Sequence, residues 1–349
     1  MSSQEKRPIG YTCAYTPLPL IDAAGFRPYR ILPMGDTPDQ AGQYLHDNLC
    51  PHVKKVLDQV LAGKVPDLAG AVLMNSCDAM RRLADAWRAA RPQDNIMLVD
   101  LPVTTDEAAL KFFAVQLEVL AEQLKLWGGL DFDTADLAAS LADFNKLSGT
   151  LADLGAAIRS GRQKGSRAAL QALYNACTQR SMVESIQNCQ LPTAEAVPKN
   201  GVPIFLFGNV LPDPEAFELI ADCGARIVGD DLCTGYRQFA GLEADSAEES
   251  VYLQLARHIL TKPPCARTFF PAQPGRVAHD TLAAAQACGA AGVIGHTVKF
   301  CDPYLARMPI FREEFKKAGM PLLLLEGDCT LRSMGQQRTR IEAFIEMLR

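Results

Sequence analysis

The stretch 70–87, GAVLMNSCDAMRRLADAW, joins a short, mostly apolar run to an amphipathic segment through a cysteine. The apolar run is typical of a strand buried on both faces, and a helical pattern begins at Asp78. A buried strand followed by a helix is the repeating unit of a parallel sheet covered on both faces. The stretch therefore predicts such a sheet, with Cys77 at the carboxyl end of one strand.

The same alternation occupies both ends of the chain, separated by residues 106 to about 190, whose apolar positions have helical spacing. Strands are predicted at 8–13, 29–32, 70–75, 95–100, 203–207, 225–229, 292–297 and 321–326. Helices are predicted to begin near Pro17, Pro51, Asp78, Asp213, Ser246, His279, Tyr304 and Ser333. The expected fold is α/β, with two Rossmann-like parallel-sheet domains (1–105 and 198–349) flanking a helical segment (106–197).

The composition and charge of the chain indicate which classes of binding partner are unfavourable. The chain has 349 residues, 48% of them hydrophobic, and a formal net charge of -5 without a run of Lys and Arg. This balance argues against nucleic acid and against a membrane surface as partners. The N-terminal residues lack the apolar core of a signal peptide, so a cytoplasmic location is expected. Neither GxGxxG after the first strand nor GxxxxGK[ST] is present, so no nucleotide site is predicted.

Six of the eleven cysteines fall at predicted strand ends, a helix entry or a Pro-bounded loop. They are Cys13, Cys50, Cys77, Cys233, Cys265 and Cys301. Ligands bind beyond the carboxyl ends of parallel strands, and thiols in reach of one another in the cytosol are typical of metal or redox sites. No CxxC pair indicates a zinc ribbon, so an iron-sulfur cluster in an interdomain cleft fits best. The alternative for any single position is a small buried core residue.

Six motifs carry a family resemblance in order along nearly the whole chain: TCAYTPLPLIDAAGFRPYRIL, NLCPHVKKVLDQVLAG, NSCDAMRRLADAW, GDDLCTGYRQF, VKFCDPY and GQQRTRIEAFIEML. Together they resemble the 2-hydroxyacyl-CoA dehydratase / benzoyl-CoA reductase family, as a D-component-like subunit. The resemblance implies a 4Fe-4S cluster in the cleft, with Cys50, Cys77 and Cys301 as ligands. It further implies an acyl-CoA substrate and a homo- or heterodimer with a homologous subunit. Single electrons would come from a separate ATP-hydrolysing iron-sulfur activator protein.

Two departures keep alternatives open. Pro17, Leu18 and Pro19 stand where many relatives read Pro-Glu-Glu, so no catalytic acid or base is assigned. The full set of six cysteines resembles the double-cubane branch, in which Cys13, Cys233 and Cys265 would be additional ligands of an 8Fe-9S cluster that reduces a small molecule. A third alternative is a cluster-binding scaffold without turnover.

Several charged and polar residues have simpler expected roles. His52 is expected to face solvent and His296 to lie in the core. Arg237 and Arg340 are expected in surface ion pairs, with contacts to CoA phosphates as the alternative. Asp230 and Asp231 are expected to cap the following helix, with a role in orienting a ligand near Cys233 as the alternative.

Overall fold

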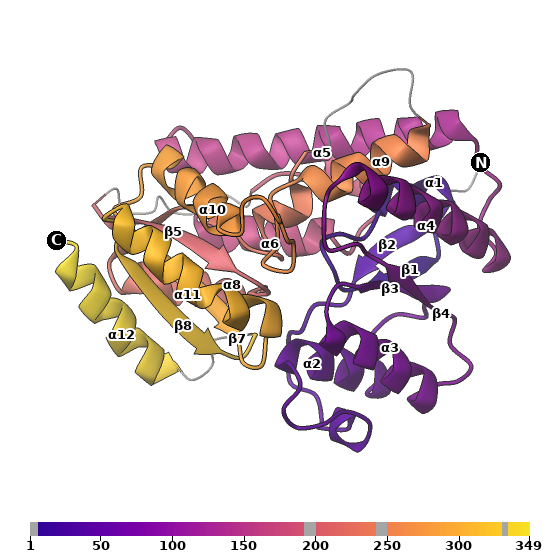
Figure 1. Ribbon diagram of the computed structural model, residues 1–349, viewed down its shortest axis with the longest axis horizontal. Helices are drawn as coiled ribbons and strands as arrows, with labels where there is room; N and C mark the ends of the chain where they lie inside the picture. The colour runs from indigo at the N-terminus through magenta and orange to yellow at the C-terminus, as the bar shows by residue number, and fades with distance from the viewer. Residues whose placement is uncertain (1–5, 192–199, 242–249, 330–333) are drawn as a thin grey trace.

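The computed structural model describes residues 6–191, 200–241, 250–329 and 334–349. Two four-stranded, fully parallel sheets lie side by side, with strand orders β2-β1-β3-β4 and β6-β5-β7-β8 (Figure 1). Each order reverses between the first and the third strand of its sheet. Such a reversal opens a crevice at the carboxyl ends of the two strands, where ligands of open α/β sheets bind.

The first sheet is formed by β1 (Pro8–Tyr11), β2 (Arg27–Arg30), β3 (Gly70–Asn75) and β4 (Ile96–Asp100). The second sheet is formed by β5 (Val202–Gly208), β6 (Ala225–Asp231), β7 (Gly292–Val298) and β8 (Leu322–Gly327). The central strands β3 and β7 are almost wholly buried, which explains their continuous apolar sequence. All eight strand predictions are confirmed, with ends that differ by two residues or fewer.

Helices cover the first sheet on both faces. One face carries α2 (Pro51–Leu61) and α3 (Asp78–Ala90), and the other carries α1 (Leu18–Ala23) and α4 (Glu107–Leu126) (Figure 1). In α2 the buried residues Val53, Val56, Leu57 and Val60 recur at helical spacing and form one apolar stripe. The pattern fixes which side of the helix faces the sheet.

Around the second sheet lie α8 (Pro214–Asp222), α10 (Arg276–Ala287), α11 (Asp302–Lys317) and α12 (Met334–Met347). The predicted start at His279 is wrong by one turn. The helix begins at Arg276, directly after the turn at Pro274 and Gly275. Likewise α11 begins at Asp302 instead of Tyr304, with Pro303 in its first turn, where a missing N–H costs nothing. The predicted starts at Ser246 and Ser333 lie outside the described residues.

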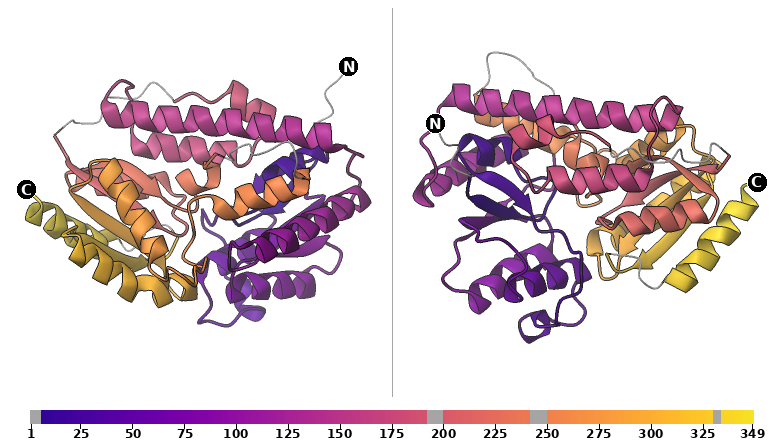
Figure 2. Two further views of the ribbon diagram at one scale, coloured as in Figure 1. Left: turned by 45° about the horizontal axis from the view of Figure 1, so that its top comes forward. Right: turned by 180° about the vertical axis from the view of Figure 1, so that it is seen from behind.

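A helical layer joins the two sheets. It contains α5 (Thr134–Ser160), α6 (Arg167–Cys177), α7 (Met182–Gln187) and α9 (Val251–Thr261). The long helix α5 packs on α1 of the first unit and on β6 of the second, and it runs past both sheets in Figures 1 and 2. The helical segment expected between the sheets is thus present, while the three-part division at residues 105 and 197 stays a prediction. Within the described ranges, no helix has the length and apolarity needed to cross a membrane.

Candidate metal-cluster site

The carboxyl ends of the two sheets face one small cavity of about 90 Å³. Its lining combines the strand-end segments of both sheets, including Thr12 and Ser76 from the first and Asn209 and Val298 from the second. All six cysteines singled out from the sequence contribute to it, namely Cys13, Cys50, Cys77, Cys233, Cys265 and Cys301. Residues up to 288 positions apart in sequence, Cys13 and Cys301, therefore line one site.

Three of these thiols share a local geometry, since each is the residue that precedes the first turn of a helix. Cys50 precedes α2, Cys77 precedes α3 and Cys301 precedes α11. A helix N-terminus carries unpaired N–H groups and a partial positive charge, both of which favour an anionic sulfur. Three such ends directed at one cavity form a site suited to an anionic group.

The backbone before Cys301 is held in an unusual conformation. Phe300 has φ +57°, and among the described non-glycine residues it is the one with a positive φ. A bulky residue in this region stores strain, which persists where the surrounding structure determines it and is concentrated at functional sites. The turn at Phe300 lies between the end of β7 at Val298 and Cys301, which precedes α11.

The other three thiols lie near buried cations. Arg30, only 1% exposed, places Nη2 3.1 Å from the Sγ atom of Cys233 and also donates from Nη1 to the Cys233 carbonyl at 2.7 Å. Lys262, 7% exposed, donates from Nζ to the carbonyl of Ala14, which lines the cavity next to Cys13. Arg30 is the last residue of β2, and Lys262 directly follows α9.

Arg237 is the third buried cation and lines the cavity itself. It pairs with Asp231 at 2.7 Å and lies 3.2 Å from the hydroxyl of Tyr304. The expectation of a surface ion pair for Arg237 is wrong, because its side chain is 1% exposed and also donates to the carbonyl of Gly208 at the end of β5. Arg340 is exposed and donates to the carbonyl of Leu324 instead.

Cys233 differs from the other five thiols of the cavity in the direction of its pKa shift. Burial raises the pKa of Cys50 to about 12, against the opposing effect of the His52 and Val53 N–H groups, and burial also raises the pKa of Cys301. Burial raises the pKa of Cys13 to about 11. For Cys233, burial is outweighed by Arg30 and Arg237, which lower its pKa. Metal binding at the buried thiols would therefore release protons.

The remaining lining residues fit a metal-sulfur group. Among the described lining residues there is no carboxylate, and the buried Nε2 atom of His52 has no hydrogen-bond partner. The expectation that His52 faces solvent is wrong, since it is 5% exposed and lines the cavity. No three His, Cys, Asp or Glu side chains of the described ranges converge on a point for one metal ion. Cluster ligands bind different irons, so they stand further apart than the ligands of a single ion.

The pair Asp230 and Asp231 follows the expected capping role in part. Asp230 accepts a hydrogen bond from the Tyr236 N–H at 2.8 Å, at the start of the short 3₁₀ helix η2 (Tyr236–Phe239), whereas Asp231 serves Arg237. His296 is buried on β7, as predicted. Sequence reasoning missed Arg30 and Lys262, because lone cations in a strand and at a helix end give no pattern that distinguishes them from surface charges.

The other five cysteines lie outside the lining of this cavity; they are Cys177, Cys189, Cys223, Cys288 and Cys329. Four of them are buried as core residues, which agrees with the simpler interpretation given to these positions.

Leu18 and Pro19 are buried in α1. Both residues lie outside the cavity lining, and their role at the site expected from the resemblance stays untested.

Fold and site define a class of protein: a two-sheet α/β protein whose strand-end thiols line one cavity between the sheets. The chain belongs to the family described as "2-hydroxyglutaryl-CoA dehydratase, D-component", whose model matches residues 13–348. It is 24% identical to the lactoyl-CoA dehydratase subunit beta of Anaerotignum propionicum over 98% of this chain and 92% of that one. It is 25% identical to the (R)-2-hydroxyglutaryl-CoA dehydratase subunit beta of Acidaminococcus fermentans over 99% and 93%. A shorter match, over 40% of this chain and 37% of the relative, is 23% identical to a benzoyl-CoA reductase subunit of Thauera aromatica.

Proposed function

We propose that this protein is the iron-sulfur subunit of a 2-hydroxyacyl-CoA dehydratase, or of a related acyl-CoA reductase, and holds a 4Fe-4S cluster through Cys50, Cys77 and Cys301. The observation that carries this proposal is the meeting of three helix N-termini, each preceded by a cysteine, at one cavity. Three thiolate ligands leave one iron open, as substrate activation requires. When bound, the cluster would supply single electrons at low potential.

The chain's own residues would hold and insulate that centre. The apolar walls, including Val53, Met80 and Val298, exclude water, and the three helix ends stabilise negative charge. Because the described lining contains no carboxylate, a carboxylic acid for proton transfer to the leaving hydroxyl would have to come from outside this cavity. This supports a dimer with a homologous subunit, as the beta-subunit names of the relatives suggest.

Two further partners belong to the proposal. The chain carries no nucleotide motif, so ATP hydrolysis would occur in a separate iron-sulfur activator protein that passes electrons to this one. The location of such a low-potential system would be the cytoplasm. A 2-hydroxyacyl-CoA is the proposed substrate class. Examples are the lactoyl-CoA named for the Anaerotignum propionicum subunit and the phenyllactyl-CoA named for a dehydratase beta subunit of Clostridium sporogenes that is 23% identical to this chain.

A second candidate is supported by a separate observation. Arg30, Arg237 and Lys262 are buried beside Cys13, Cys233 and Cys265, and the carboxylate of Asp231 pairs with Arg237. A buried charge without a counter-charge destabilises the folded state by several kcal/mol. Here the positive charge of three cations exceeds the negative charge of one carboxylate. Thiolates of a double-cubane 8Fe-9S cluster bound by all six cysteines would balance the remainder, and the protein would then reduce a small molecule.

The test is anaerobic iron and sulfide quantitation, with electron paramagnetic resonance after dithionite reduction. Wild-type protein is expected to bind about four irons per chain, and Cys77→Ala to lose them, whereas Cys223→Ala, at a buried cysteine outside the cavity, keeps them. About eight irons, reduced by Cys265→Ala, would favour the double-cubane alternative.

Measurement of turnover distinguishes the non-catalytic scaffold from a catalytic subunit. Iron-loaded protein mixed with a homologous partner subunit, an ATP-hydrolysing activator and lactoyl-CoA or phenyllactyl-CoA should release the dehydrated acyl-CoA. A protein that binds iron and activator but forms no product with these thioesters would be a scaffold. Iron-free protein after reconstitution would contradict all three alternatives.

A further inference from the structure

The buried cations beside the thiol cavity differ in how their charge is balanced. Arg237 pairs with the carboxylate of Asp231 at 2.7 Å. Arg30 lies 3.1 Å from the Sγ atom of Cys233, and its positive charge helps to lower the pKa of that thiol. Each of the two guanidinium groups therefore has an acidic group within contact distance, and the two positive charges are compensated locally.

Lys262 is the buried cation without such a partner. It is 7% exposed, and no carboxylate of the described ranges forms an ion pair with it. Its Nζ atom donates to the neutral carbonyl of Ala14 and lies 5.2 Å from the centre of the Tyr15 ring. Ala14 and Tyr15 both line the thiol cavity. Burial lowers the pKa of Lys262 to about 8, so the side chain is still mostly charged at pH 7.

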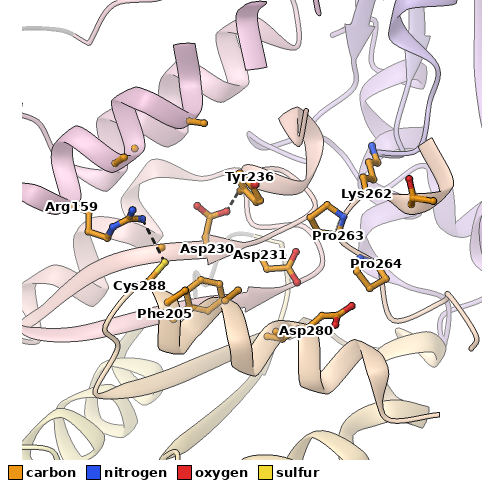
Figure 3. A pocket seen from close by; sticks show the side chains of 18 of the residues that line it. Arg159, Phe205, Asp230, Asp231, Tyr236, Lys262, Pro263, Pro264, Asp280 and Cys288 are labelled. Carbon is orange, nitrogen blue, oxygen red and sulfur yellow. Dashed lines mark hydrogen bonds between the residues drawn. The ribbon is translucent and has the colours of Figure 1, made fainter. Parts of the chain in front are cut away.

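Two prolines restrict the backbone next to this lysine. Pro263 and Pro264 follow Lys262 on the loop after α9, as Figure 3 shows, and Cys265 comes next. Each proline ring fixes its own φ angle. The N–H of Cys265 donates at 2.9 Å to the hydroxyl of Tyr15, the same side chain whose ring lies near the ammonium. The ammonium and the Cys265 thiol thus belong to one restricted segment in the wall of the cavity.

We propose that the ammonium of Lys262 is the counter-charge for the electron that the cluster accepts, and that it thereby raises the reduction potential of the site. Reduction adds one electron and neither forms nor breaks a bond, so the negative charge in the cavity grows by one. A nearby cation stabilises the reduced form more than the oxidised form, most strongly where water is excluded. Arg30 and Arg237 contribute less, because each already contacts an acidic group.

This inference rests on the proposed function and applies to a cluster of four or of eight irons. Its test is an anaerobic redox titration of iron-loaded protein with dithionite, followed by electron paramagnetic resonance. Lys262→Met removes the charge but keeps a side chain of similar length. It should make the one-electron reduction about tenfold less favourable or more, which corresponds to a fall in midpoint potential of about 59 mV or more.

Two further variants isolate the effect of charge in this titration. Lys262→Arg keeps the positive charge and should restore most of the potential that Lys262→Met loses. Lys111→Met removes the charge of an exposed lysine on α4, outside the lining of the thiol cavity. Because solvent and salt screen an exposed charge, it should change the reduction equilibrium by less than about twofold.

Urea unfolding of the metal-free protein separates this electrostatic role from a structural one. Replacement of a lysine that serves only to hold the fold would lower the urea midpoint. We expect the midpoint of Lys262→Met to be unchanged or higher than that of the wild type. The reason is that removal of an uncompensated buried charge offsets the lost hydrogen bond to Ala14.

A wild-type potential in iron-loaded Lys262→Met would overturn the inference, as would an equal fall in Lys262→Met and Lys262→Arg, which would indicate altered packing. Loss of iron from Lys262→Met would support the inference if the metal-free variant is as stable as the wild type, and would overturn it if the variant is less stable. Wild-type protein without iron would instead contradict the proposed function, so the two failures are distinguishable.

Discussion

The guanidinium of Arg30, on β2 of the first sheet, lies 3.1 Å from the Sγ atom of Cys233, which follows β6 of the second sheet. The same group donates to the carbonyls of Cys233 and Thr12 and to the side chain of Gln238. One buried side chain thus ties the strand ends of the two sheets together. The contact joins the two halves of the thiol cavity, which come from different sheets.

Replacing Arg30 by Met should destabilise the metal-free protein by about 3 kcal/mol, since several buried acceptors lose their charged donor. Urea unfolding under reducing conditions measures the change. Arg27→Met, on the same strand but partly exposed, is the control and should cost less than about 1.5 kcal/mol. Equal losses in the two variants would mean that Arg30 does not tie the sheets.

Burial lowers the pKa of His52 to about 3, against 6.5 for an unperturbed imidazole. Below pH 6.5 the unfolded chain binds a proton that the folded one does not, so stability falls as the pH falls from 6.5 toward 3. Between pH 7 and pH 5 this residue should contribute about 2 kcal/mol to that loss. His52→Leu should remove this part of the pH dependence, measured by urea unfolding of metal-free protein at both values.

The exposed His46 provides the control for this pH effect. His46→Gln should leave the difference in unfolding free energy between pH 7 and pH 5 within about 0.5 kcal/mol of the wild type. A His52→Leu protein with the full wild-type pH dependence would show that His52 is protonated in the folded state.

Gly208 ends β5 with φ +150°, and a Cβ there would overlap the carbonyl oxygen of His296 on β7. Gly208→Ala should therefore cost about 3 kcal/mol or more in thermal or urea unfolding, because one of the central strand pairs must shift. Gly149→Ala is the matched control, since it lies within α5 with open space around it. It should stabilise by about 0.5–1 kcal/mol. A similar effect at both glycines would refute the close contact between β5 and β7.

The Arg237–Asp231 pair is almost wholly buried, with side chains 1% and 9% exposed. Asp231→Asn should cost about 3–5 kcal/mol, because it leaves a buried guanidinium without its counter-charge. The exposed pair Lys317–Glu313, at 2.8 Å, is the control, and Glu313→Gln should cost less than about 1 kcal/mol. A double-mutant cycle of Asp231→Asn with Arg237→Met measures the coupling, and a coupling near zero would contradict the ion pair.

Local patterns predicted the elements and the placing of the thiols on them. The apolar run 70–75 becomes β3 with the predicted bounds, and Pro51 and Asp78 begin α2 and α3 as expected. Cys77 and Cys301 were placed at strand ends from sequence alone, because strand ends and helix starts are encoded by neighbouring residues. Their roles as ligands stay a prediction.

By itself the sequence determined two parallel sheets, a helical segment between them and a set of thiols at strand ends. The tertiary structure decided that Cys13, Cys233 and Cys265 line the same cavity as Cys50, Cys77 and Cys301, and that Arg30, Arg237 and Lys262 lie beside them. Burial of a charged side chain depends on partners distant in the sequence, such as Arg30 and Cys233, 203 residues apart. No local pattern of residues encodes such a contact, since it forms only when the two sheets pack together.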